Sequence, residues 1–305
     1  MSSLELVAQY VLEKLQEKRP LFVAIQGPQG SGKSFLSSRL QSYLEATPHT
    51  LRVAVLSIDD LYLPHDDLVS LAASNPENFL WQGRGQPGTH DVDLGVQILS
   101  ALKAGNNVVE LPRFEKSLFE GEGDRLPIDG SGPVVTQPPT LDVVILEGWC
   151  VGFQPISDEE LLSRWNGVWK LERERLGLGE VQMGRLVDVQ AINDKLHLYL
   201  RLWDFFDVLI QAEPPTASGL SQYAVVYKWR MEQEHNMKAR NGGRGMSDNA
   251  VKSFVDRYIP GYVFFGGFPI LVANRDHSPT SSSRAMNGMT LILDEARQVT
   301  GATLF

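Results

Sequence analysis

The chain has 305 residues, of which 43% are hydrophobic and 21% are charged, and its formal net charge is −9. This composition is typical of a globular protein and excludes a fibrous or largely disordered chain, while the negative charge argues against nucleic acid as a partner. The single cysteine, Cys150, excludes an intrachain disulfide, and the chain has neither a signal-peptide pattern nor a run of about 20 apolar residues. We therefore expect a cytoplasmic protein, small enough to enter the nucleus by diffusion, with no membrane partner.

Apolar runs and helical patterns alternate along the chain. Ser2 and Glu5 have the spacing of a capping box, so the first helix is expected to begin there. Short β-rich apolar runs occur at residues 21–26, 51–57, 107–111, 141–146, 206–210 and 269–273. Helical patterns separate several of these runs, at residues 33–46, 92–104, 194–205 and 219–240. This order predicts an α/β fold with a mostly parallel sheet that carries helices on both faces.

Three further stretches complete the expected organisation. Residues 121–140 are rich in glycine and proline and predict a loop. Residues 157–190 are rich in charge and predict a helical insertion at the surface. Residues 277–285 predict a polar turn before a last helix. With no composition break along the chain, we expect residues 1–305 to form a single domain.

The motif G-x-x-x-x-G-K-[ST] lies between the apolar run 21–26 and the helical pattern that begins at Lys33. In this context it predicts a phosphate-binding loop of the P-loop NTPase type, because glycine backbone and the amides at the start of a helix can surround phosphate oxygens. Lys33 is expected to neutralise the β- and γ-phosphates of ATP, and the Ser34 hydroxyl is expected to bind Mg²⁺. The residues expected to bind the nucleotide are Gly27, Pro28, Gln29, Gly30, Ser31, Gly32, Lys33, Ser34 and Phe35.

Carboxylates follow two of the predicted strands. Glu147 comes directly after the run 141–146, where open α/β sheets bind ligands, so we expect it to hold Mg²⁺ through water. Asp59 and Asp60 follow the run 51–57, and either carboxylate could accept the proton of an alcohol that attacks the γ-phosphate. If the chain stays extended, Asp60 points to the side opposite Asp59.

A lid is expected over residues 228–246, around the end of the predicted helix 219–240. Arg240 and Arg244 lie beside glycines in this stretch. Arginines next to a glycine hinge suit a segment that closes over the triphosphate and stabilises the charge on the transferred phosphoryl group.

The P-loop together with the spacing Ser57-x-Asp59-x-x-Tyr62 resembles the group of P-loop kinases that contains uridine kinase, phosphoribulokinase and pantothenate kinase. The resemblance is closer to the plant-type D-glycerate 3-kinases and their fungal relatives, the ATP-dependent kinases. It spans about residues 21–275, and the segments that carry it are Gly83 to Asp91, Pro112 to Ser117, Gly123 to Arg125, Glu147 to Trp149 and Gly245 to Asp248.

This resemblance implies a Mg-ATP-dependent kinase in which Asp59 is the base and the second partner is a small molecule with a hydroxyl group. Basic residues in the loops would suit a carboxylated acceptor such as glycerate, because arginine pairs well with a carboxylate. The residues expected to bind the acceptor are Asp60, Tyr62, Arg84, His90, Arg113, Lys116 and Arg125.

Two alternatives stay open at this point. The acceptor could be another alcohol, such as a sugar, a nucleoside or a pantothenate-like molecule. The protein could also be a switch that binds or hydrolyses ATP and acts on a protein partner. The two aspartates beside the P-loop strand argue against a switch, because a switch has to position water and needs no wall that binds an alcohol.

Overall fold

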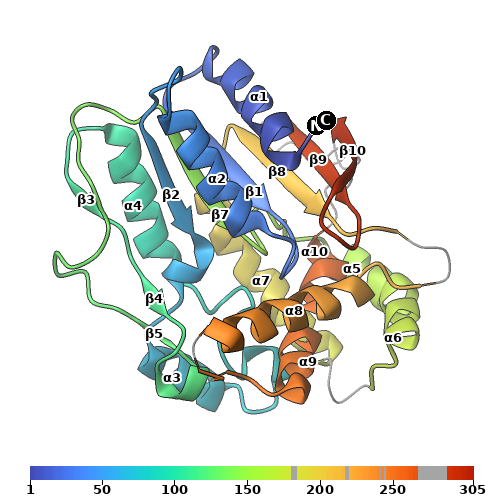
Figure 1. Ribbon diagram of the computed structural model, residues 1–305. Helices are drawn as coiled ribbons and strands as arrows, with labels where there is room; N and C mark the ends of the chain where they lie inside the picture. The colour runs from blue at the N-terminus through green and yellow to red at the C-terminus, as the bar shows by residue number, and fades with distance from the viewer. Residues whose placement is uncertain (180–183, 217–219, 241, 244, 267–286) are drawn as a thin grey trace.

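The computed structural model describes residues 1–179, 184–216, 220–240, 242–243, 245–266 and 287–305. Its main strands are β1 (Leu21–Gln26), β2 (Val53–Ser57), β7 (Val143–Gly148), β8 (Val208–Glu213), β9 (Asn287–Leu293) and β10 (Val299–Leu304). Within the described residues they form one sheet in the order β10-β9-β8-β1-β7-β2, parallel throughout except between β9 and β10 (Figure 1). Two short antiparallel pairs lie outside this sheet, β3 (Val109–Glu110) with β6 (Val134–Val135) and β4 (Phe114–Glu115) with β5 (Asp124–Arg125).

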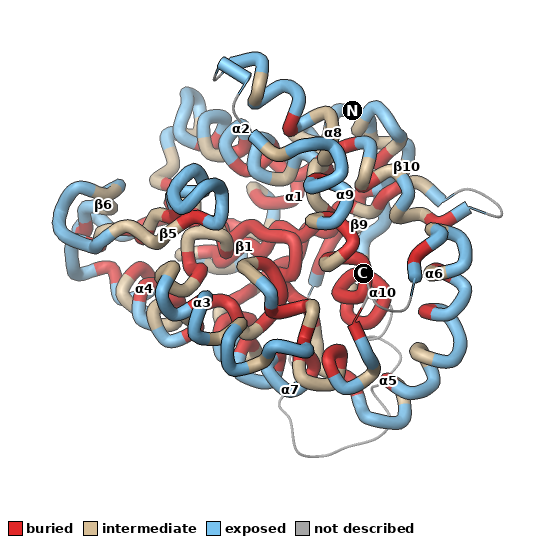
Figure 2. Tube along the Cα trace, turned by 90° about the horizontal axis from the view of Figure 1, so that it is seen from below, coloured by how far each residue is buried: buried red, intermediate tan, exposed pale blue. Residues whose placement is uncertain are grey.

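Helices cover both faces of the sheet, and each face has its own apolar core. The helices are α1 (Ser3–Leu15), α2 (Lys33–Glu45), α3 (His65–Ser74), α4 (Val92–Ala104), α5 (Asp158–Arg164), α6 (Lys170–Leu176), α7 (Leu186–Trp203), α8 (Ala224–Arg240), α9 (Asp248–Asp256) and α10 (Ile259–Phe265). On one face, α1 and α2 pack on strand residues such as Val23 and Ile145. On the other face, α4, α7 and α10 pack on the alternate residues, such as Phe22 and Val144. The buried chain accordingly runs through the centre of the molecule, and the exposed chain surrounds it (Figure 2).

The predicted α/β fold with a mostly parallel sheet is confirmed. The capping box of α1 is present, because Ser2 Oγ accepts a hydrogen bond from the Glu5 amide (3.3 Å) and the Glu5 carboxylate accepts one from the Ser2 amide (2.7 Å). The helical patterns at 33–46 and 92–104 correspond to α2 and α4. Four of the predicted apolar runs correspond to β1, β2, β7 and β8, all buried in the sheet.

Two expectations about secondary structure are wrong, and one expected helix is longer than the sequence indicates. The run 107–111 does not enter the main sheet, since its burial alternates, with Val108 exposed and Val109 and Leu111 buried, which is the pattern of a small one-sided pair. The helix expected at 194–205 already begins at Leu186, where Asp188 accepts a hydrogen bond from the backbone amide before the helix. The last helix is replaced by the hairpin of β9 and β10, because parallel pairing of β9 with β8 imposes alternating burial on this segment.

The remaining expected stretches are either outside the described residues or only partly as expected. The strand expected at 269–273 and the polar turn at 277–285 lie outside the described residues. The stretch 121–140 is a loop apart from β5 and β6. The charge-rich stretch 157–190 is helical over α5 and α6, as expected, but Trp169 within it is fully buried in the core, so the stretch does not lie wholly at the surface. None of the described helices combines the length and the apolar character that crossing a membrane requires.

Candidate active site

The P-loop connects β1 to α2 and turns through two glycines in the left-handed region. Gly30 has a φ of 74°, and Gly32, which directly precedes α2, has a φ of 90°. Residues with a side chain rarely adopt such values, so both positions favour glycine. Because α2 begins at Lys33, its first backbone amides face the space beyond the end of β1, where they can bind a phosphate group.

A tyrosine from α10 supports this loop. The Gln29 amide donates a hydrogen bond to the hydroxyl of Tyr262 (3.0 Å). Tyr262 is buried, and its ring packs edge-on against Trp149, directly after β7. The loop is therefore tied to the helical layer by a residue 233 positions away, and no spacing in the sequence indicates this role.

Ser34 and Glu147 offer a site that fits Mg²⁺. The Ser34 hydroxyl donates a hydrogen bond to Glu147 Oε1 (2.9 Å), and the pairing of β1 with β7 brings Glu147 beside the P-loop strand. The other carboxylate oxygen, Oε2, is buried and makes no hydrogen bond within the described part of the chain. A hydroxyl and a carboxylate are oxygen ligands that suit Mg²⁺, which usually keeps several waters and binds the phosphates of its nucleotide.

A pocket of about 250 Å³ lies at the carboxyl ends of β1, β2 and β7. Its lining residues are Lys33, Ser34, Ser57, Asp59, Asp60, Lys116 and Glu147. All of them except Ser57 are among the residues that the sequence proposes for the site. The parallel pairing of β7 with β1 and with β2 explains their meeting, because the ends of parallel strands lie at one edge of the sheet.

Asp59 and Asp60 both line this pocket, so the expectation that Asp60 points to the opposite side is wrong. The chain does not stay extended after β2 but turns into a short 3₁₀ helix over Ile58–Leu61. Ser57 caps this helix, with its hydroxyl accepting a hydrogen bond from the Asp59 amide (3.3 Å). Two neighbouring carboxylates therefore share one pocket.

Asp59 is held ionised by a lysine. Lys116 Nζ lies 2.5 Å from Asp59 Oδ2, and the Asp59 side chain is 29% exposed. Burial by itself would raise the pKa of Asp59, but the charges of Lys116 and Lys33 outweigh it and hold the pKa of this carboxyl well below its usual range.

The pKa of Asp60 is shifted in the opposite direction, upward. Burial and, to a lesser extent, the Asp59 charge raise the pKa of Asp60 to about 6, although the hydrogen bond that its Oδ1 accepts from the Phe114 amide (3.1 Å) opposes this shift. The same hydrogen bond ties β4 to the end of β2. Since Lys116 follows Phe114 by two positions, this tie also brings the lysine to Asp59.

Two of the basic residues expected at the acceptor are engaged elsewhere. His90 is buried, with Nδ1 2.7 Å from the Tyr199 hydroxyl and its ring stacked on Tyr62. Burial lowers the pKa of His90 to about 3, so the imidazole is neutral and does not add to a positive cluster. Arg125 pairs with Asp91 at 2.8 Å, at the start of α4.

Two further arginines lie near the pocket without lining it. Arg84 donates to the Gly121 carbonyl (2.6 Å), and its guanidinium carbon lies 5.5 Å from the centre of the Phe114 ring. Arg113 donates to the Ser131 hydroxyl (2.8 Å). Arg84 is thus the arginine that lies behind the segment carrying the pocket lysine.

Tyr258 and Arg257, which the sequence does not single out, complete the wall beside Arg84. The hydroxyls of Tyr258 and Tyr62 share a hydrogen bond, and both rings are buried. A Cβ atom on Gly85 would lie 2.5 Å from the Tyr258 hydroxyl, and one on Gly83 would lie 2.8 Å from Arg257 Nη1. These glycines therefore let the backbone pass close to two side chains at the end of α9.

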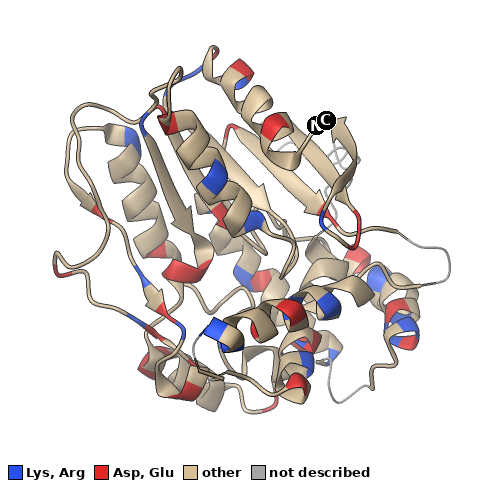
Figure 3. Ribbon diagram, viewed as in Figure 1, with Lys and Arg blue, Asp and Glu red and all other residues tan. Residues whose placement is uncertain are grey.

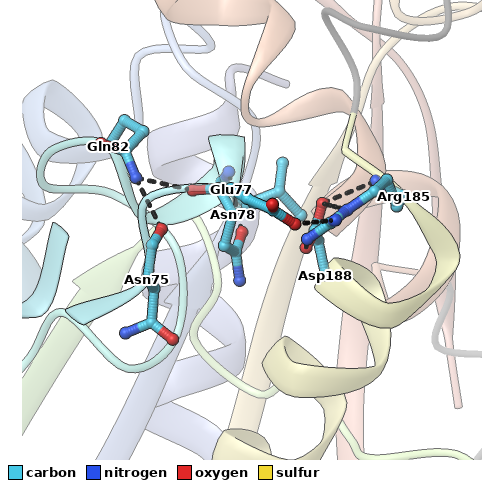
Figure 4. Close-up of polar contacts among 7 residues, drawn as sticks. Asn75, Glu77, Asn78, Gln82, Arg185 and Asp188 are labelled. Atoms are coloured by element: carbon cyan, nitrogen blue, oxygen red, sulfur yellow. Dashed lines mark hydrogen bonds and ion pairs between the residues drawn. The ribbon is translucent and has the colours of Figure 1, made fainter. Parts of the chain in front are cut away.

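The segment that leads into this glycine run, residues 75–82, is held by polar contacts at the start of α7 (Figure 4). Gln82 Nε2 donates to the Asn78 carbonyl (3.1 Å). Arg185, just before α7, pairs with Glu77 at 2.5 Å. These contacts order the segment that precedes Gly83 and connect it to the start of α7.

The expected lid begins in α8, which lies beyond the carboxyl ends of the parallel strands (Figure 1). The last turn of α8 contains basic residues, Lys238 and Arg240, and the ribbon is blue at that end of the helix (Figure 3). Arg240 is exposed there and is not part of the pocket lining, and Arg244 lies outside the described residues. Glu234 is fully buried, pairs with Arg230 (2.8 Å) and accepts a hydrogen bond from the Met246 amide (2.7 Å), so the chain after α8 folds back onto this helix.

No family model matches the chain, but individual proteins do. An uncharacterised kinase of Schizosaccharomyces pombe is 38% identical over 309 residues, which cover 97% of this chain and 98% of that kinase. A probable ATP-dependent kinase of Saccharomyces cerevisiae is 35% identical over 272 residues, which cover 86% of this chain and 84% of the relative. The solved structure of a D-glycerate 3-kinase from Cryptococcus neoformans is 36% identical, matches 100% of both chains and has a TM-score of 0.82.

Proposed function

Because this chain belongs to the family of ATP-dependent kinases that contains these relatives, we propose that it transfers the γ-phosphoryl group of Mg-ATP to a hydroxyl group of a small carboxylated metabolite such as D-glycerate. Family membership establishes a kinase with an alcohol acceptor. The carboxylate on the acceptor, the metal and the roles of single residues are our proposal. The observation that carries it is the pocket in which Lys33, Asp59 and Lys116 meet.

On the nucleotide side, the P-loop amides and Lys33 would bind the β- and γ-phosphates of ATP. Ser34 and Glu147 would hold Mg²⁺, which neutralises charge on these phosphates when it is bound. The unpartnered Oε2 of Glu147 supports this assignment, because a buried carboxylate oxygen is expected to have a partner.

On the acceptor side, Asp59 would receive a hydrogen bond from the attacking hydroxyl. The acceptor oxygen then forms a bond to the γ-phosphorus, the bond from that phosphorus to ADP breaks, and the hydroxyl proton passes to the Asp59 carboxylate. The low pKa of Asp59 keeps it ionised in the resting enzyme, so its main contribution is to orient the hydroxyl.

The contact between Asp59 and Lys116 is what favours a carboxylated acceptor. An anion and a cation 2.5 Å apart match a molecule that carries a hydroxyl and a carboxylate close together. In this arrangement the hydroxyl meets Asp59 and the acceptor carboxylate meets Lys116, with Arg84 behind it. Arg240 and Arg244 would close over the triphosphate from the lid.

The test is ADP release by the purified protein with Mg-ATP and a panel of alcohols. D-glycerate is expected to support turnover, while glycerol, which has the same carbon skeleton without the carboxylate, should have a kcat/KM at least tenfold lower, on the order expected for a lost charged pair. Equal rates with both alcohols would contradict the carboxylate assignment. Turnover only with uridine, a sugar or pantothenate would move the acceptor to that class, and ATP use that no alcohol stimulates would favour a switch.

A further inference from the structure

Three segments far apart in the chain meet at Gly30 of the P-loop. They are the loop itself at Gly30, helix α8 at Trp229 and the turn between β9 and β10, which extends toward the start of α8 (Figure 1). A Cβ atom on Gly30 would lie 2.6 Å from Trp229 Cβ, so only glycine permits this approach of the loop to the helix. Trp229 is fully buried, and its Nε1 donates a hydrogen bond to the Glu295 carbonyl in the turn (2.8 Å).

Arg297, in the same turn, contacts both of the other segments. Its Nε donates a hydrogen bond to the Gly30 carbonyl (2.6 Å), and its Nη2 lies 3.4 Å from the Trp229 carbonyl. Nη2 also pairs with Glu232 of α8 at 2.9 Å, and the guanidinium carbon lies 5.5 Å from the centre of the Trp229 ring. One side chain from the end of the chain therefore fastens the P-loop to the base of the helix in which the proposed lid begins.

The backbone conformation of Arg297 is strained, which costs conformational free energy in the folded protein. Its φ of 65° is in the left-handed region, which residues other than glycine rarely adopt. The turn enforces it, because the Arg297 amide donates to the Asp294 carbonyl (3.0 Å) and the Gln298 amide donates to Asp294 Oδ1 (2.8 Å). Strained backbone that the surroundings hold in place is typical of positions with a functional task.

We propose that Arg297 is a positioning residue for nucleotide binding, which fixes the Gly30 peptide group and the base of α8 in one arrangement before ATP arrives. Arg297 does not line the pocket, so it acts through the loop and not by contact with the phosphates. A loop with glycines at positive φ has much conformational freedom to lose, and a loop ordered in advance binds its ligand more tightly. This inference rests on the proposed function only in that the P-loop is the nucleotide site.

The test is Arg297→Gly, because glycine adopts a φ of 65° without strain and only the side chain is lost. The affinity for ADP, titrated calorimetrically without any acceptor, is expected to fall about tenfold, as for the loss of a hydrogen bond from a charged donor. In the kinase assay the KM for ATP should rise by about the same factor, with the KM of the acceptor unchanged. Relief of the backbone strain offsets part of the lost contacts, so the melting temperature should fall by only a few degrees, and Arg297→Lys should recover part of the affinity.

Lys228→Gln is the matched control, because Lys228 pairs with Glu295 of the same turn at 2.7 Å, an exposed contact on the outer side of α8. Its ADP affinity should equal that of the wild type. Wild-type ADP affinity in Arg297→Gly would overturn the inference, and so would a loss that Lys228→Gln shares. If the wild type binds ADP but phosphorylates no acceptor, the proposed function fails, while the titration still decides the role of Arg297.

Discussion

The ammonium group of Lys116 lies 2.5 Å from the carboxylate of Asp59, although the two residues are 57 positions apart. The hydrogen bond from the Phe114 amide to Asp60 brings the segment to this place, so one short stretch contacts both neighbouring carboxylates. Burial would raise the pKa of Asp59, and the lysine charge opposes this effect. The ionisation state of Asp59, the proposed base, therefore depends on Lys116, a residue of another segment.

Lys116→Gln is expected to lower kcat/KM for the acceptor by on the order of 10²-fold and to move the acidic limb of the pH-rate profile to higher pH. The reason is that burial then acts on Asp59 without the lysine charge, which raises the pKa of the carboxyl. Lys116→Arg, which keeps the charge, is the control and should retain the acidic limb of the wild type. Superimposable profiles of Lys116→Gln and the wild type would contradict the role given to this pair.

Arg84→Ala is expected to raise the KM of the acceptor about tenfold and to leave the KM of ATP little changed. Arg84 packs against Phe114 of the segment that carries Lys116 and donates to the Gly121 carbonyl. Arg113→Ala is the matched control, since its guanidinium bonds to Ser131 along the loop. A loss of ATP affinity in Arg84→Ala, with acceptor affinity unchanged, would assign this arginine to the nucleotide instead.

The sheet and its helices could be predicted from the sequence because their signals are local. Buried parallel strands are continuous apolar runs, and the capping box at Ser2 marks the start of α1. The strand partners of a run are not local, so the apolar run 107–111 does not show that it lies outside the main sheet. The hairpin of β9 and β10 was missed for the same reason, since its alternating burial follows from pairing with β8.

The nucleotide half of the site was also predictable, because the P-loop motif is contiguous and Glu147 ends a strand. The acceptor half was predicted less well, since charge in the sequence does not tell whether a side chain is buried. His90 counts as basic in the sequence, yet burial makes it neutral. Tyr262 and Arg297 support the loop from positions more than 200 residues away, and no motif links them to it.

Asp60→Asn is expected to stabilise the protein at pH 8 but not at pH 4. The pKa of about 6 in the folded protein lies above the ordinary value of 3.8, so the contribution of Asp60 to stability is complete below about pH 4 and is lost as the pH rises through 6. Asparagine stays neutral and can still accept the hydrogen bond from the Phe114 amide. Urea unfolding at both pH values should show a gain of about 1–3 kcal/mol at pH 8 only. The same gain at pH 4 would contradict the raised pKa.

The two aspartates should also differ in catalysis, and their kinetics separate a kinase from a switch. Asp59→Asn preserves the shape of the side chain and removes its charge, so kcat for phosphorylation of the acceptor is expected to fall about 10²- to 10⁴-fold. ADP affinity, titrated without acceptor, should stay nearly unchanged, because Asp59 faces the acceptor hydroxyl and not the phosphates.

Asp60→Asn provides the comparison at the neighbouring position. Asp60 accepts a hydrogen bond from the Phe114 amide and is partly protonated near pH 6, so it is a poorer partner for the hydroxyl, and its loss should lower kcat far less. A larger loss in Asp60→Asn than in Asp59→Asn would exchange the two roles. If Asp59→Asn keeps the kcat of the wild type with every alcohol that supports turnover, neither its charge nor its orientation of the hydroxyl limits the reaction, and catalysis must then rest on the phosphate side of the pocket, on Lys33 and the P-loop amides.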